Sequence, residues 1–264
     1  MTQAQLTQAL AGISSQNVFA FFLVLARVTP LFIVAPGFSS KMLMPRVRSV
    51  LAVALALGLT PLARHNQTIP QDVLPVVGLL LENFLVGLGL AYTIACVFGA
   101  VQGAGVFADA FGGFSFGQTV DPINGNPGGS MTNLYTMVGL AMFLAIGGDA
   151  WTLRGMSATF TAIPIADAVQ PKPLIAAAES ACASLLIGAV EIAAPVILAI
   201  VVTDIALGMI SKVVPQVNVF AVGFTVKVGV TLLIVGVSLP FMGGWMSNQL
   251  ETSLATTVHS LRIG

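Results

Sequence analysis

Long apolar runs dominate this sequence, and they leave it few possible folds. About 17 to 25 apolar residues suffice for a helix to cross a bilayer, and six runs approach or exceed that length. They cover residues 18–34, 46–62, 73–107, 131–146, 174–212 and 218–242. Charged residues make up only 8% of the chain, against about 25% in soluble domains. The sequence therefore predicts an all-α integral membrane protein with about six apolar helical segments.

The fifth run, 174–212, is too long for one straight span. As a single helix it would measure about 58 Å at ~1.5 Å per residue, whereas the hydrocarbon core is about 30 Å thick. Pro195 lies inside the run, and proline is a common cause of sharp kinks. We expect this helix either to kink at Pro195 or to extend well beyond the bilayer. A tight turn at 213–217 then pairs it with the sixth run as a hairpin.

Charged residues also lie inside the apolar runs, where each would cost about 2.5 to 3.5 kcal/mol at the centre of a lipid-exposed helix. They are Arg27, Glu82, Glu179, Glu191, Asp204 and Lys227. We expect all six to face protein, one another or water, and burying them requires other subunits because the chain is small. In a hairpin that turns at Pro215, Asp204 and Lys227 come to the same depth. We therefore predict an ion pair between these two residues.

A stretch rich in glycine and phenylalanine, 103–130, separates the third run from the fourth. Pro122 and Pro127 lack the backbone donor that a helix or a sheet needs. Irregular backbone at membrane depth is tolerated only where it is buried in protein or lines a water-filled cavity. The phenylalanines make the stretch too apolar for a solvated linker. We interpret it as a loop inside a passage, with an ordinary connector as the alternative.

Motifs for catalysis or metal binding are missing from the sequence. It has no phosphate-binding loop that ends in Lys-Ser or Lys-Thr, no His-Glu-x-x-His and no Gly-x-Ser-x-Gly. Asp109 and Asp121 share the central stretch, but their spacing alone does not indicate acid–base chemistry. The net charge is zero, so there is no basic footprint for nucleic acid. We expect no enzyme activity, no catalytic residue, no cofactor, no metal and no nucleic-acid partner.

Three blocks of the sequence resemble the FliR family of the bacterial flagellar export apparatus, a family shared with virulence type III secretion. The first block is RVTPLFIVAPGFSSKMLMPRVRSVLAVALALGLTP, at 27–61. The second is GGFSF at 112–116, continued by VDP at 120–122. The third covers 195–224 and contains ALG at 206–208 and PQ at 215–216. With the order of the runs, this resemblance covers nearly the whole chain.

The resemblance implies a core subunit of the export gate in the bacterial inner membrane, within the flagellar basal body. Such a subunit joins FliP and FliQ subunits, as one copy, in a helical pore that lies partly outside the bilayer plane. The pore exports unfolded flagellar subunits. Residues 1–173 would be a FliP-like part, and residues 174–264 would be a FliQ-like long hairpin.

The resemblance also implies a role for the central stretch, because in the family this loop plugs the closed pore. The plug would lie at about 111–126 in this sequence. Its expected residues are Phe111, Gly112, Gly113, Phe114, Ser115, Phe116, Gly117, Val120, Asp121 and Pro122.

The orientation in the membrane follows from the basic residues. Lys41, Arg46 and Arg48 form the densest basic cluster, and such clusters favour the cytoplasmic side. Both termini then lie outside and the hairpin turn lies inside. The resemblance makes this turn a candidate contact for FlhB, with FlhA as a further partner. The expected contact residues are Ser211, Lys212, Val214, Pro215, Gln216 and Asn218.

Two other classes of function are alternatives to an export gate. A secondary transporter would bind substrate and ions at broken helices and midplane charges, and it would show paired repeats with matching interruptions. The sequence has no convincing internal repeat, which disfavours a transporter. A purely structural scaffold would carry the same sequence features as a gate, so this alternative stays open.

Overall fold

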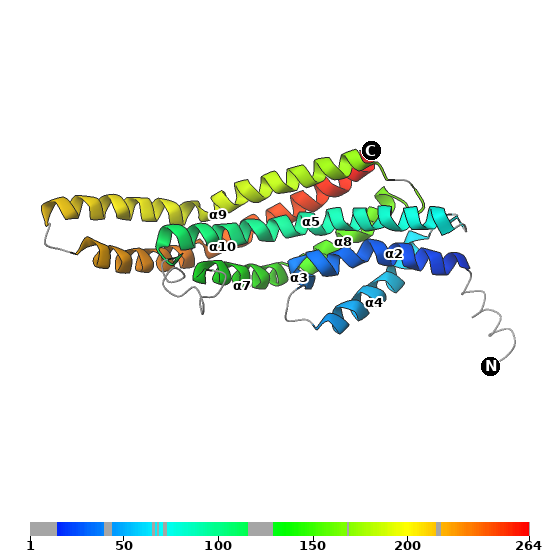
Figure 1. Cartoon of the computed structure of the whole chain (residues 1–264), viewed down its shortest axis with the longest axis horizontal. Helices are drawn as coiled ribbons and strands as arrows, with labels where there is room; N and C mark the ends of the chain where they lie inside the picture. Colours follow the sequence, from blue (N-terminus) through cyan, green and yellow to red (C-terminus); the bar gives the residue numbers. More distant parts are fainter. Residues whose placement is uncertain are drawn as a thin grey trace. The chain divides into compact units, whose positions relative to one another are not determined.

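The computed structural model describes residues 15–39, 44–64, 67, 69–70, 73–115, 129–167, 169–214 and 218–263. These residues form helices and no strands (Figure 1). In chain order the helices are α2 (Ser15–Val34), α3 (Pro36–Ser39), α4 (Pro45–Ala63), α5 (Val73–Gly112), α7 (Ser130–Ala145), α8 (Gly148–Ala162), α9 (Pro171–Val213) and α10 (Val219–Ile263). The prediction of an all-α fold is confirmed.

Membrane-spanning character is confirmed as well. Within the described residues, α2, α4, α5, α9 and α10 are long and apolar enough to cross a membrane. Helices α7 and α8 follow one another at Gly147, and together they qualify as a sixth, broken span. This agrees with the expectation of about six apolar segments.

Three helical segments differ from the prediction. Helix α5 continues to Gly112, so 103–112 is helical, whereas the sequence predicted the start of a loop there. Helix α10 continues far beyond Met242, through the polar end of the chain. Helix α8 occupies 148–162, where no helix was predicted.

Packing explains why α5 continues through its glycines. A Cβ at Gly103 would lie 2.9 Å from the Cβ of Ala189, and one at Gly105 would lie 2.6 Å from the Cα of Thr132. Glycine in a helix costs up to about 1 kcal/mol relative to alanine, but here it allows neighbouring helices to approach closely. The glycines that suggested a loop are therefore contact points between helices.

Helix α9 is continuous from Pro171 to Val213, with Pro195 inside it. Its 43 residues correspond to about 65 Å at ~1.5 Å per residue. The helix is therefore longer than the hydrocarbon core of a bilayer, which is about 30 Å thick.

The chain divides into two compact units. The first unit contains the chain up to Ala95 together with 147–181 and 250–264, and the second contains 96–146 and 182–249. Helices α5, α9 and α10 contribute residues to both units. The units do not coincide with the predicted division at 173/174, which concerns likeness to FliP and FliQ and stays a prediction.

In the first unit, α2 packs on α4. The buried residues of α2 include Leu23, Val24, Val28 and Leu31, which recur at helical spacing along one face. Arg27 lies within this same face and is also fully buried.

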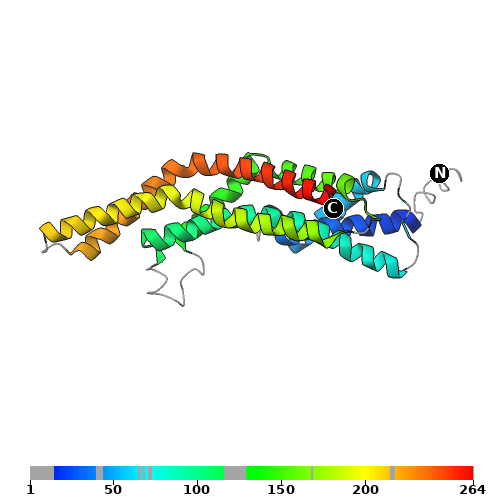
Figure 2. The same ribbon diagram turned by 90° about the horizontal axis from the view of Figure 1, so that it is seen from above.

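In the second unit, residues of four helices form one core. It contains Val101, Ala104 and Ala108 of α5, Met131 and Tyr135 of α7, Ile192, Ala193, Val196 and Ile200 of α9, and Val235 and Met242 of α10. The parts of α9 and α10 that belong to this unit run side by side in both views (Figure 1, Figure 2). The end of α5 and the start of α7, which flank the central stretch, are held by this core.

Candidate functional site: the loop anchors and the long hairpin

Helix α5 ends at Gly112, and Gly113 follows with a φ of +84°. This left-handed conformation is the one in which glycine commonly ends a helix, because other residues are strained there. A Cβ at Gly113 would lie 3.4 Å from the ring of Phe224 on α10, and one at Gly112 would lie 2.7 Å from Thr231 Oγ1. The chain therefore leaves α5 in close contact with α10.

The first residues of the predicted plug differ in their surroundings. Phe114 packs against the core of the second unit. Phe111 lies in the last turn of α5 and is 43% exposed, with its ring 6.5 Å from that of Phe107. Among the remaining predicted plug residues, Ser115 is half-buried. Phe116, Gly117, Val120, Asp121 and Pro122 lie outside the described residues.

Asp109 joins α5 to the start of α7. The backbone N–H of Met131 donates to Asp109 Oδ1 over 2.9 Å, and that of Thr132 donates to Oδ2 over 2.9 Å. The hydroxyl of Thr132 donates to Oδ2 over 2.6 Å. Asp109 is 3% exposed, and a Cβ at Gly129 would overlap its carboxylate. Asp109 thus fastens together the two helix ends that flank the central stretch.

This carboxylate replaces a local N-cap. The first N–H groups of a helix have no partner within it, and a side chain at the N-cap usually satisfies one of them. The N-cap of α7 is Gly129, which has no side chain to accept a hydrogen bond. Asp109 supplies the acceptors instead, and its negative charge is favourable at a helix N-terminus. Sequence reasoning missed this role and treated Asp109 only as an unplaced acid.

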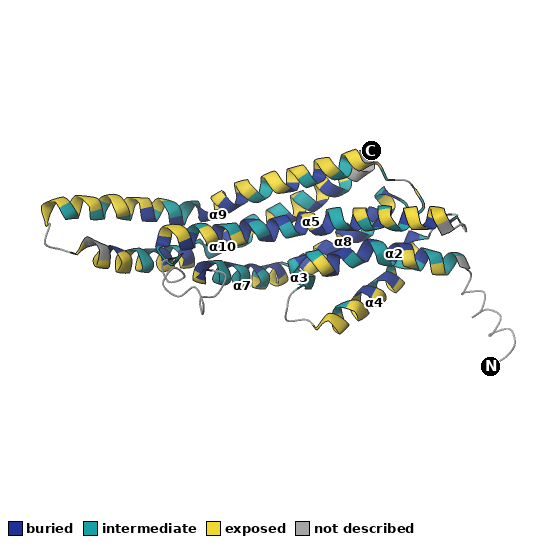
Figure 3. Ribbon diagram, viewed as in Figure 1, coloured by how far each residue is buried: buried dark blue, intermediate teal, exposed yellow. Residues whose placement is uncertain are grey.

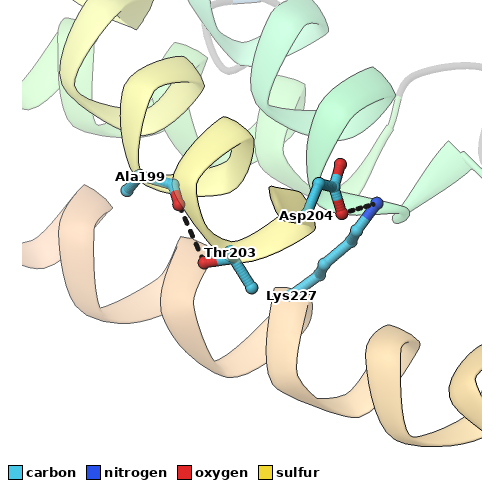
Figure 4. Close-up of polar contacts among 4 residues, drawn as sticks. All are labelled: Ala199, Thr203, Asp204 and Lys227. Carbon is cyan, nitrogen blue, oxygen red and sulfur yellow. Dashed lines mark hydrogen bonds and ion pairs between the residues drawn. The ribbon is translucent and has the colours of Figure 1, made fainter. Parts of the chain in front are cut away.

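The predicted ion pair of the hairpin is confirmed. Lys227 Nζ lies 2.7 Å from Asp204 Oδ1, between α10 and α9 (Figure 4). The Lys227 side chain is 29% exposed and that of Asp204 is 48% exposed.

Other contacts show the register of the hairpin. Closer to the turn than the ion pair, the side chain of Leu207 packs against Gly223. A Cβ at Gly223 would lie 3.3 Å from Leu207 Cδ1. Farther from the turn, the indole N–H of Trp245 donates to Glu191 Oε2 over 2.8 Å. The ion pair and the Leu207–Gly223 contact join positions about equally distant from the turn, and the Trp245–Glu191 hydrogen bond joins the two helices farther along, so α9 and α10 form an antiparallel hairpin.

Arg27 is the charged residue that the first unit buries completely. Its Nε donates to Asn83 Oδ1 over 2.9 Å. Its Nη1 donates to the carbonyls of Thr159 and Ile163 over 3.0 and 2.8 Å. The guanidinium also lies 4.7 Å from the ring centroid of Phe160. The Nη2 atom is buried and has no hydrogen-bond partner among the described residues.

Helix geometry explains how this cation is accommodated without a carboxylate among these contacts. Thr159 is in the last turn of α8 and Ile163 is its C-cap. Carbonyls at a helix C-terminus lack some of their intrahelical partners and carry the negative end of the helix dipole. Arg27 therefore offsets the charge of this helix end and satisfies its acceptors.

The remaining acids of the apolar runs are partly or largely exposed on this chain. Glu82 is half-buried, and its Oε2 accepts a hydrogen bond from the N–H of Val169 over 3.1 Å. Glu179, Glu191 and Asp204 are exposed. The expectation that other subunits bury these charges stays a prediction.

The hairpin turn is described at its two ends. Lys212, Val214 and Asn218 are exposed, and Ser211 is half-buried. Asn218 Oδ1 accepts a hydrogen bond from the N–H of Ala221 over 3.3 Å, which caps the start of α10. Pro215 and Gln216 lie outside the described residues.

Comparison with known proteins gives consistent matches over most of the chain. The profile of "Bacterial export proteins, family 1" matches residues 18–253. The flagellar biosynthetic protein FliR of Pectobacterium carotovorum is 28% identical over 226 residues, which cover 84% of this chain and 85% of that protein. FliR of Bacillus subtilis is 29% identical over 232 residues, with coverage of 84% and 88%. The surface presentation of antigens protein SpaR of Salmonella typhimurium is 27% identical over 211 residues, with coverage of 79% and 78%.

Proposed function

Because this chain belongs to the bacterial export proteins, family 1, and is a membrane component of the flagellar or type III export apparatus, we propose that it forms part of the export pore itself. The pore lies in the bacterial inner membrane, in the flagellar basal body, and passes unfolded flagellar subunits. The chain carries out no reaction and needs no cofactor, since other parts of the apparatus supply the energy.

The observation that carries this proposal is the anchoring of the central stretch by Asp109. The carboxylate ties α5 to Met131 and Thr132 in the first turn of α7. After the end of α5, Gly113 has a left-handed backbone conformation and lies against the ring of Phe224. With both ends fixed, the residues between them can block a channel or leave it while the flanking helices stay in place. We propose that residues 111–126 are this plug, with Phe111 and Phe116 among the side chains that exclude water and ions.

The outer surface of the hairpin formed by α9 and α10 is the surface on which we propose that partner chains bind. Large apolar side chains stay exposed there (Figure 3). They include Val202, Ile205, Met209, Leu233 and Val237. Such a surface is stable against lipid or against other apolar helices. We propose that FliP and FliQ subunits cover much of it around a single copy of this chain, and that the exposed turn residues contact FlhB, with FlhA nearby.

The test of the plug is the ion conductance of the assembled complex in a planar bilayer. The deletion should remove 117–127, because this range spares Asp109, Phe114 and Gly129, which hold the ends. The deleted complex should assemble at the normal yield and conduct ions, whereas the parent complex stays closed. A control replaces 117–127 by glycine and serine at equal length, so that chain length and side-chain bulk are separated. A deletion complex that assembles fully and stays closed contradicts the plug and favours an ordinary connector.

A further inference from the structure

A groove of about 450 Å³ lies between α8 and the C-terminal part of α10, within the first unit. Its volume falls within the range of roughly 300 to 1,000 Å³ that is typical of small-molecule sites. None of the functional roles described above involves it. It is formed by the segment of α10 beyond Met242, where the sequence predicted no helix.

Small residues open this groove. A Cβ at Gly155 would lie 3.3 Å from Leu254 Cδ2, so α8 and α10 approach closely there. Leu254 is buried, and Gly155, Ala158, Ala255 and Val258 line the groove beside this contact. Its walls are therefore mostly apolar.

Two opposite charges line the same groove without joining each other. Arg154 comes from α8 and Glu251 comes from α10, and both are exposed. The ion pair of the hairpin, Asp204–Lys227, involves neither of them. The guanidinium of Arg154 instead lies 5.9 Å from the ring centroid of Trp151, which also lines the groove. Tryptophan and arginine together are typical of the depth at which lipid headgroups lie.

We propose that this groove binds a zwitterionic phospholipid with a primary amine in its headgroup. Arginine recognises phosphate through its planar fork of donors, so Arg154 binds the phosphate. The Glu251 carboxylate accepts hydrogen bonds from the ammonium group, and an acyl chain lies along Ala158, Leu254 and Val258. The apolar wall favours a lipid over a free amino acid or a free headgroup, neither of which would cover it. This site does not depend on the proposed plug.

The experiment is a lipid titration of the purified full-length chain in mild detergent, followed by native mass spectrometry. Three lipids with equal acyl chains are compared: phosphatidylethanolamine, phosphatidylcholine and phosphatidylglycerol. We expect phosphatidylethanolamine to bind most tightly, because phosphatidylcholine has no N–H to donate and phosphatidylglycerol has no cation. Removal of one charge-assisted hydrogen bond corresponds to about a tenfold loss of affinity.

Variants separate the two charges of the groove. Arg154→Gln should weaken the binding of all three lipids. Glu251→Gln should weaken phosphatidylethanolamine most, phosphatidylcholine less and phosphatidylglycerol not at all, and so remove the preference over phosphatidylglycerol. Lys172→Gln is the matched control, because it removes an exposed charge of the same unit outside the groove. Ala255→Phe, at an exposed position, should fill the groove and reduce binding of every lipid.

Three outcomes would overturn the proposal. The first is equal lipid binding by the parent chain, Arg154→Gln and Lys172→Gln. The second is an unchanged lipid preference in Glu251→Gln. The third is that glycerophosphoethanolamine, which lacks acyl chains, competes as well as the intact lipid.

Discussion

Asp204 of α9 and Lys227 of α10 form an ion pair, with 2.7 Å between the carboxylate and the ammonium group. Both residues lie inside helices that are long and apolar enough to cross a membrane. On the chain alone the pair is partly exposed. Its contribution therefore depends on what surrounds it. A pair in water contributes about 0 to 1 kcal/mol, whereas loss of one partner where water is excluded costs about 3 to 5 kcal/mol.

The first prediction concerns this pair. Asp204→Ala and Lys227→Ala should each lower the yield of assembled export complex, because each leaves one charge uncompensated in an apolar hairpin. Exchange of the two residues should restore part of the yield. Thr203→Ala is the control: the neighbouring hydroxyl donates to Ala199 O of its own helix, over 2.8 Å (Figure 4). Normal yields of both single variants would show that water or partner groups solvate the two charges separately.

The second prediction concerns the loop anchor. Asp109→Ala should destabilise the second unit by about 1 to 3 kcal/mol, because the buried N–H of Met131 and the part-buried N–H of Thr132 lose their acceptors. Under native conditions, the amides of Met131 and Thr132 should exchange their hydrogens faster in this variant than in the parent chain, through local opening. Asp149→Ala removes an exposed acid from the first turn of α8 and should leave both measurements nearly unchanged. Unaltered exchange in Asp109→Ala would contradict the anchor.

The third prediction compares two glycines of α5. A Cβ at Gly87 would overlap the backbone carbonyl of Arg27, whereas one at Gly78 has no neighbouring atom within 4 Å. Gly87→Ala should therefore lower the free energy of unfolding by about 1 to 3 kcal/mol, since backbone atoms must shift. Gly78→Ala should raise it by up to about 1 kcal/mol through helix propensity. Thermal unfolding in detergent measures both, and equal effects would contradict the close approach of α2 and α5.

The fourth prediction concerns Arg27. Arg27→Met keeps an unbranched side chain but leaves Asn83 Oδ1 and the carbonyl of Ile163 without this donor, at a cost of about 1 to 3 kcal/mol for each unsatisfied group. Arg27→Lys should recover only part of this stability, because an ammonium group cannot reproduce the guanidinium fork. Arg46→Met, at an exposed position of α4, is the control. A fully stable Arg27→Met would show that these acceptors find other donors.

The fifth prediction separates two phenylalanines. Phe114→Ala should lower thermal stability, because its ring packs against the core of the second unit. Phe111→Ala should lower stability less, because its side chain is 43% exposed, and it should raise the ion conductance of the assembled complex. If Phe111→Ala conducts no more than the parent complex, Phe111 is not part of the barrier.

The sequence predicted the long helices and the Asp204–Lys227 pair for a common reason. Apolar runs indicate where the helices lie. In a hairpin with a short turn, residues that are equally far from the turn lie side by side. Those relations depend on local pattern and on counting residues from one turn. The same counting applies to Leu207 and Gly223, which are also paired across the hairpin.

Other relations depend on distant backbone atoms, which have no sequence signature. Arg27 bonds to carbonyls of Thr159 and Ile163 that any residue could supply. Asp109 bonds to N–H groups 22 and 23 positions later in the chain. The glycines near Gly105 resemble loop residues in a single sequence, and only the neighbouring backbone of Thr132 shows why they are small.

The Asp109 anchor also makes the central stretch modular. All three bonds end on the first residues of α7, so the attachment does not use the sequence between 116 and 128. A foreign segment, such as a protease site or a fluorescent-dye tag, can therefore replace the middle of this stretch while its two ends stay fixed. Such an insert would report, from within the working apparatus, when this part of the chain becomes accessible to reagents.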